Sequence, residues 1–159
     1  MSNSVRGAKF WVSVWLPVLV AIGLVAIEST LYFGADRTSG PLRHFWEWLF
    51  GPVTDHHWHI IHFLIRKCGH FTGFGLVGLT WLRAWRMTLP RASFLRIELL
   101  ALAGSALVAS ADEYHQSFLP NRTSSPRDVL LDCTGALVTI CIAYLILRVK
   151  APQWLTNAA

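Results

Sequence analysis

Charged residues are scarce in this chain. They account for 14% of its 159 residues, whereas soluble domains carry roughly a quarter. Hydrophobic residues make up 53%, and eight tryptophans are present. The chain is too apolar for a soluble helical bundle, and its length suits one domain. We therefore expect an all-α integral membrane protein that forms a single domain over residues 1–159.

Cysteine is also scarce, and two signatures of common catalytic sites are absent. The three cysteines, Cys68, Cys133 and Cys141, lie within or at the ends of apolar runs. We expect buried thiols there rather than a disulfide framework. The sequence contains no Gly-x-Ser-x-Gly nucleophile elbow and no His-Glu-x-x-His zinc motif. We therefore expect no metal and no cofactor.

Four apolar runs predict membrane-spanning helices over about 10–28, 67–86, 95–113 and 129–148. A spanning helix needs roughly 20 residues, and the last three runs reach that length only with flanking polar residues. The first run ends in Glu28 without a small-residue cleavage site, so we expect it to be retained rather than removed as a signal peptide. Together the four runs predict a four-helix bundle.

Lysine and arginine orient the predicted helices. Eight of them lie in the N-terminal segment, in the connection between the second and third runs, and in the C-terminal segment, whereas six lie on the other side. The compact connection at residues 83–96 carries four arginines close to the membrane, which favours a cytoplasmic position. Both termini are therefore expected in the cytoplasm. We interpret the net charge of +5 as this orientation signal, and expect no nucleic-acid partner.

A long stretch separates the first two apolar runs. Pro41–Phe50 mixes tryptophans and phenylalanines with charged residues, which predicts an amphipathic segment at the outer interface. Asp55 is a possible N-cap of a further helix. A zinc site formed by Asp55, His59 and His62 is an alternative, but we interpret the histidines of residues 56–62 as interfacial.

Helix geometry places several ionisable residues at one depth. Three intervals of sixteen residues connect the two expected membrane boundaries: Lys67 to Arg83, Arg96 to Asp112, and Asp132 to Arg148. Each interval spans roughly 24 Å, less than the hydrocarbon core of about 30 Å. Lys67, Asp112 and Asp132 are therefore expected at a common level below the outer headgroups, with His70 deeper. Stripes of small residues direct these polar groups into the bundle, where ionisable groups are costly and usually functional.

Recognition of an anionic ligand is the first hypothesis for these residues. The guanidinium of Arg122 can bind a phosphate or a carboxylate through two hydrogen bonds, and Lys67 adds a positive charge. The expected ligand-binding residues are Arg122, Lys67, Gln116, Asp128 and Asp132. We expect the partner to be a membrane lipid or a lipid-linked cell-wall precursor.

Catalysis is the first alternative. His115 or His70 would act as general base, and Asp112 or Glu113 would orient the imidazole. These residue types would suit a hydrolase or a transferase that acts on a lipid head group. The sequence does not decide whether the protein is an enzyme.

A structural role is the second alternative. Arg122 would then pair with Asp112 or Asp128 in a closed ion-pair network that locks the helix ends. A small transporter is a further option, although four helices form a tight conduit unless the protein oligomerises. The sequence does not predict the oligomeric state.

The order and spacing of the polar residues resemble a known family. The matching pattern is Arg66-Lys67-x-x-His70-Phe71, then Asp112-Glu113-x-His115-Gln116-x-x-x-Pro120-x-Arg122, then Asp128 and Gly135. This pattern is similar to that of the VanZ-like family of bacterial membrane proteins over residues 64–147. The resemblance implies a small helical protein of the bacterial inner membrane. The founding member is associated with teicoplanin resistance, which implies a role in the cell envelope and in glycopeptide susceptibility.

Two positions depart from the family pattern. Gly73-Phe74 stands where members commonly have Glu-Tyr, and Asp132 stands where many have Asn. A mechanism that needs a carboxylate on the second helix would therefore depend on Asp132 or Glu28 in this chain.

Overall fold

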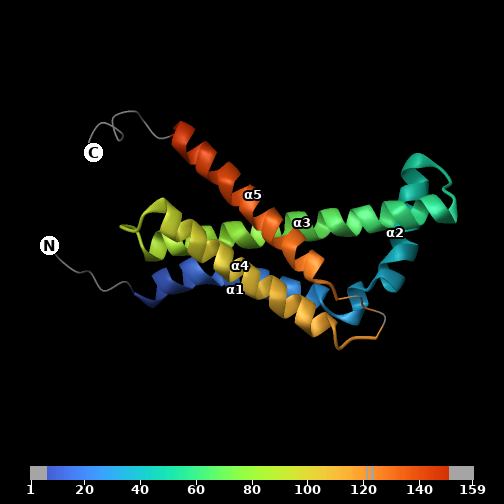
Figure 1. Cartoon of the computed structure of the whole chain (residues 1–159), viewed down its shortest axis with the longest axis horizontal. Helices are drawn as coiled ribbons and strands as arrows, with labels where there is room; N and C mark the ends of the chain where they lie inside the picture. The colour runs from blue at the N-terminus through green and yellow to red at the C-terminus, as the bar shows by residue number, and fades with distance from the viewer. Residues whose placement is uncertain (1–6, 121, 123, 151–159) are drawn as a thin grey trace.

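The computed structural model describes residues 7–120, 122 and 124–150, with side chains up to residue 147. The elements, in chain order, are α1 (Ala8–Glu28), the 3₁₀ turn η1 (Leu31–Phe33), α2 (Ala35–Phe50), α3 (Asp55–Thr88), α4 (Phe94–Gln116) and α5 (Pro126–Lys150) (Figure 1). No strand occurs in this part of the chain. The all-α prediction is therefore confirmed.

Three of the helices are long and apolar enough to cross a membrane. They are α1, α4 and the part of α5 that ends at Leu147, and they support the prediction of a multi-pass membrane protein. The predicted four-helix bundle is not confirmed, because the described residues form five α-helices. The expected span over 67–86 is the C-terminal part of α3, where His70, several glycines and Arg83 lower the mean hydropathy.

Helix α3 is continuous where two helix starts were expected. It runs for 34 residues, which corresponds to roughly 51 Å, and its first part extends beyond the ends of α1 and α4 (Figure 1). Thr54, rather than Asp55, is the N-cap, since its side chain accepts a hydrogen bond from the His57 amide. Asp55 occupies the first turn, where a carboxylate also stabilises the helix dipole.

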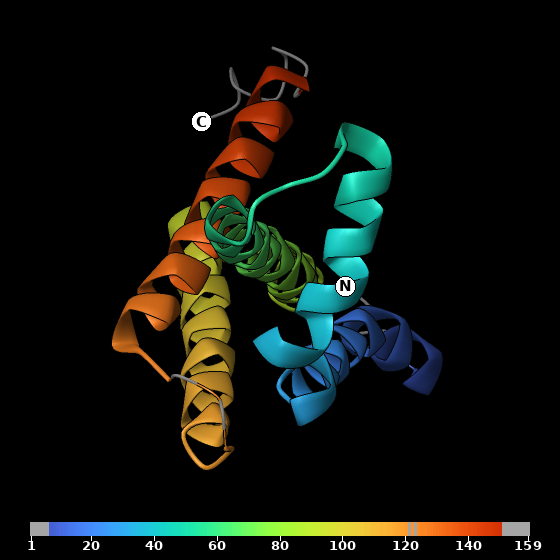
Figure 2. The same cartoon turned by 90° about the vertical axis from the view of Figure 1, so that its right-hand side faces the viewer.

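Helix α2 extends the predicted amphipathic segment towards the N-terminus. None of its residues is buried, and Figure 2 shows it on the α1 side of α3, away from α4 and α5. Arg43 fixes the end of α2 by bonding Glu47 at 2.9 Å and Asp55 at 2.6 Å. This ion pairing lowers the pKa of Glu47, chiefly through the hydrogen bond from Arg43. The helical segment is confirmed, and its interfacial position stays a prediction.

The helix ends sort into two groups along the molecule. The start of α1, the α3–α4 connection and the end of α5 lie at one end, and the end of α1 and the α4–α5 connection lie at the other (Figure 1). The arginine-rich connection is therefore at the same end as the start of α1. Assignment of that end to the cytoplasm stays a prediction, and Arg6 and the side chains of Arg148 and Lys150 lie outside the described residues.

Glycines bring α5 into direct contact with the backbone of α3. A Cβ atom at Gly135 would collide with the carbonyl oxygen of Phe71, and one at Gly78 would lie 3.0 Å from the Cβ of Ala136. Small residues permit such approach between membrane helices. One turn before Gly135, Asp132 is consequently held against α3 with none of its surface exposed.

We predict that Gly135→Ala destabilises the protein by about 1–3 kcal/mol, the usual cost of overpacking. The added methyl group would meet a backbone oxygen, which cannot move aside without shifting α3. Thermal unfolding in detergent measures the effect. Gly23→Ala is the matched control, because nothing lies within 4 Å of a Cβ at this helical position. Equal melting temperatures for the two variants would contradict the close contact between α3 and α5.

Candidate functional site

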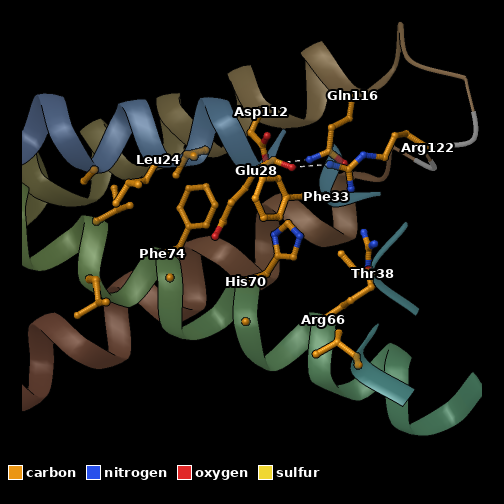
Figure 3. A pocket seen from close by; sticks show the side chains of 17 residues that line it. Leu24, Glu28, Phe33, Thr38, Arg66, His70, Phe74, Asp112, Gln116 and Arg122 are labelled. Atoms are coloured by element: carbon orange, nitrogen blue, oxygen red, sulfur yellow. Dashed lines mark hydrogen bonds between the residues drawn. The ribbon is translucent and has the colours of Figure 1, made fainter. Parts of the chain in front are cut away.

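Polar side chains from α3, α4 and the α4–α5 connection converge on two cavities that share lining residues, and Figure 3 shows the larger of the two. The large cavity has a volume of about 340 Å³ and extends between α1 and α3. The small cavity measures about 200 Å³ and lies beside the N-terminal part of α3. The residues that line both cavities are Arg66, His70, Gln116 and Arg122. These four residues define the junction between the cavities.

Helical spacing explains how α3 contributes to both cavities. His62, Arg66, His70 and Gly73 follow one another at intervals of three or four residues, so they share one face of the helix. His62 lies near Thr38 of α2, with 3.2 Å between Nε2 and the hydroxyl oxygen. Burial, with a smaller contribution from the positive charge of Arg66, lowers the pKa of His62. Burial therefore favours the neutral form of the His62 imidazole.

Arg66 and Arg122 are the cations of the junction. Neither forms an ion pair with any described residue. The Arg122 Nη2 atom donates to the backbone carbonyls of Glu28 at 2.6 Å and Thr30 at 3.1 Å, which caps the C-terminal end of α1. Arg66 Nη1 and Arg122 Nε are buried without a hydrogen-bond partner among the described residues. Two guanidinium donors therefore remain unsatisfied beside the cavities.

Lys67 is paired, unlike the two arginines. Its ammonium lies 2.5 Å from Asp128 Oδ1 and 5.3 Å from the centre of the Phe63 ring. The pair joins α3 to the first turn of α5 and is partly shielded from solvent, with the two side chains 28% and 19% exposed. Lys67 and Asp128 therefore neutralise each other at the wall of the small cavity.

Asp112, Asp132 and His70 meet at the inner side of the junction. His70 Nδ1 lies 3.4 Å from Asp132 Oδ1, and Gln116 Nε2 donates to Asp112 Oδ2 at 3.0 Å. Suitable side-chain atoms of the three residues all lie within 4.8 Å of one another. The structure thus places these two carboxylates, which helix geometry predicted at one level, together with the imidazole of α3.

Glu113 and His115 are candidate site residues that lie outside both cavity linings. Glu113 Oε2 accepts a hydrogen bond of 2.8 Å from the Ser125 amide and so holds the α4–α5 connection. His115 is exposed, with Nδ1 2.7 Å from the hydroxyl oxygen of Ser29 at the end of α1. The structure therefore brings His70, rather than His115, beside the carboxylates.

Arg66 and Phe33 line the large cavity but were not among the predicted site residues. Arg66 appeared only within the family pattern, although its position four residues before His70 was the signal that it shares a helix face. Phe33, from the 3₁₀ turn, lines the large cavity, and no periodic pattern marks such a turn. Glu28 lines the same cavity as Gly73. A carboxylate from α1 is therefore present in the cavity that Gly73 borders, where family members commonly have Glu.

Comparison with known proteins gives one match. The family model described as VanZ/LLP1 matches residues 14–148, a range that includes most of α1 as well as the expected 64–147. No curated protein and no solved structure matches the chain. The resemblance inferred from the spacing of the polar residues is confirmed.

We predict a coupling free energy of about 1 kcal/mol between Lys67 and Asp128, above the few tenths found for many exposed pairs. The pair is largely shielded, so each single substitution leaves a partly buried charge alone. A double-mutant cycle with Lys67→Met and Asp128→Asn, read from unfolding in mixed SDS micelles, measures it. Additive effects of the two substitutions would show that the contact contributes nothing to stability.

Proposed function

The chain belongs to the VanZ/LLP1 family, and we propose that its two cavities bind an anionic lipid of the cell envelope or a lipid-linked cell-wall precursor. The anionic head group would occupy the junction between Arg66 and Arg122. The lipid chain would lie along the apolar wall of the large cavity. The observation that carries this proposal is the pair of unsatisfied guanidinium groups beside a cavity that is otherwise mainly apolar.

Charge and hydrogen bonding favour an anion at the junction. Arg66 and Arg122 repel each other, and no described carboxylate pairs with either of them. A phosphate oxygen between them would relieve that repulsion and would accept from the buried donors Arg66 Nη1 and Arg122 Nε. A neutral ligand would not relieve the repulsion between the two guanidinium groups.

The opposite wall of the large cavity favours a ligand with a hydrocarbon chain. Its apolar lining residues are Ala21, Leu24, Val25, Phe33, Leu42, Phe74, Leu76 and Val77. Leu24 of α1 and Leu76 of α3 are 57% and 64% exposed, so this wall continues onto the outer surface of two helices that we place against the bilayer. A lipid chain could therefore enter sideways from the membrane without crossing water.

A hydrolase or transferase acting on the bound head group is the second candidate. His70 lines both cavities and lies 3.4 Å from Asp132, a position that suits a general base for a ligand at the junction. The structural-lock alternative loses its expected contact, because Arg122 bonds backbone carbonyls rather than Asp112 or Asp128.

We further propose that the cavities lie at the outer leaflet of a bacterial inner membrane, with both termini in the cytoplasm. This orientation places the arginine-rich connection inside. A lipid-linked cell-wall precursor is then accessible to the site, and through it the protein would affect susceptibility to teicoplanin. The link rests on the family resemblance.

Native mass spectrometry with phosphatidylglycerol tests the binding proposal. We expect Arg66→Gln and Arg122→Gln each to weaken lipid retention by about tenfold, because each removes a charge-assisted hydrogen bond. Arg91→Gln is the matched control, since Arg91 is exposed in the α3–α4 connection at the far end of the molecule. Phosphatidylcholine, which carries no net charge, should be retained weakly by every variant.

Two outcomes would contradict lipid binding at the junction. One is equal retention of phosphatidylglycerol by the wild type and the Arg66→Gln variant, provided that both unfold at the same temperature. The other is equal loss in the Arg91→Gln variant. A change in the mass of the bound lipid on incubation would favour the enzyme, and that change should disappear in a His70→Gln variant.

A further inference from the structure

His70, Asp112 and Asp132 form a compact three-residue cluster that the lipid proposal does not use. The residues come from α3, α4 and α5, and one nitrogen or oxygen atom of each lies within 4.8 Å of the others. Asp132 has no exposed surface, and Asp112 is 7% exposed. The cluster therefore combines an imidazole with two buried carboxylates from three separate helices.

The carboxylates of this cluster lack the hydrogen bonds that their burial requires. Three carboxylate oxygens receive no hydrogen bond from any described residue: Oδ1 of Asp112 and both oxygens of Asp132. Burial of an ionised carboxylate without a partner is strongly unfavourable. A single imidazole cannot compensate two negative charges. Further positive charge at the centre of the site would compensate the second carboxylate.

We propose that His70, Asp112 and Asp132 bind a divalent transition-metal ion of the zinc and manganese class. The charge of such an ion balances two carboxylates. Imidazole nitrogen and carboxylate oxygen are both ligands of Zn²⁺, and Mn²⁺ also accepts carboxylate-rich sites. Two ligands bound at about 2.1 Å in tetrahedral geometry lie about 3.4 Å apart. His70 Nδ1 and Asp132 Oδ1 are separated by 3.4 Å.

Gln116 prepares Asp112 for this role. Its amide donates to Oδ2 at 3.0 Å, which fixes the carboxylate and leaves Oδ1 without a partner. Such a contact from outside the ligand set orients metal ligands and raises affinity. His70, Asp112 and Gln116 all line the large cavity. Two of the three proposed ligands, His70 and Asp112, therefore border the large cavity, whereas Asp132 is buried behind them.

This site differs from the zinc alternative considered for residues 56–62 and departs from the expectation of no metal. His56, His57 and His59 are exposed, whereas His62 lies beside Thr38. Among the described residues, no group of three possible ligands is found there. The metal proposal is independent of the lipid proposal, because the ligands are supplied by protein side chains alone.

Metal binding to the detergent-purified full chain, without added lipid, tests the proposal. The protein is stripped with EDTA, dialysed against Zn²⁺ and assayed for metal by plasma mass spectrometry. We expect one Zn²⁺ per chain, and a loss of affinity of at least about tenfold in His70→Ala, Asp132→Asn and Gln116→Ala. His56→Ala is the control and should bind Zn²⁺ like the wild type.

Pulsed electron paramagnetic resonance of bound Mn²⁺ provides a readout that a structural role would not produce. The wild type should show the nitrogen coupling of one imidazole, and His70→Ala should lose it while His56→Ala keeps it. The wild-type spectrum alone decides the proposal, so the test remains valid even if a variant fails to fold. Wild-type protein that binds no stoichiometric metal, or Mn²⁺ without nitrogen coupling, would overturn it. Lipid retention at Arg66 would be unaffected by that result.

Discussion

Backbone contact between α3 and α5 is the constraint on which the rest of the structure depends. Gly135 lies against the carbonyl of Phe71 because neither helix places a side chain between them. This contact fixes both the distance and the register of the two helices. It brings Asp132, one turn before the glycine, beside His70, which precedes Phe71 in the sequence. A polar centre thus lies next to a direct backbone contact between two helices.

The cavities depend on a second set of contacts at the end of α1. Arg122 reaches back from the α4–α5 connection to the carbonyls of Glu28 and Thr30, and His115 meets Ser29 nearby. These contacts hold α1 beside α4 while its apolar face lines the large cavity. The junction and the apolar wall of the large cavity are therefore built by residues that lie far apart in the sequence.

The sequence predicts the parts of this arrangement that follow from helix geometry. Rise per residue was sufficient to place Asp112 and Asp132 at one level, and the family spacing singled out Arg122. The sequence pattern did not predict that residues 55–66 belong to the same helix as residues 67–86, because polar histidines interrupt the apolar pattern there, although no Gly or Pro breaks the helix. Nor did it separate His70 from His115, since that choice depends on how α1 and α5 pack around α4. Lateral position in a bundle is set by such packing rather than by periodicity.

The capping of α1 by Arg122 has a mechanical consequence. A guanidinium group is planar and rigid, so the nitrogen that holds the carbonyls of α1 cannot rotate independently of the buried Nε. Any tilt of α1 therefore turns the donor that borders the cavities, and any anion that seats on that donor resists the tilt. The tilt of α1 and the binding of an anion at the junction would therefore be coupled through Arg122.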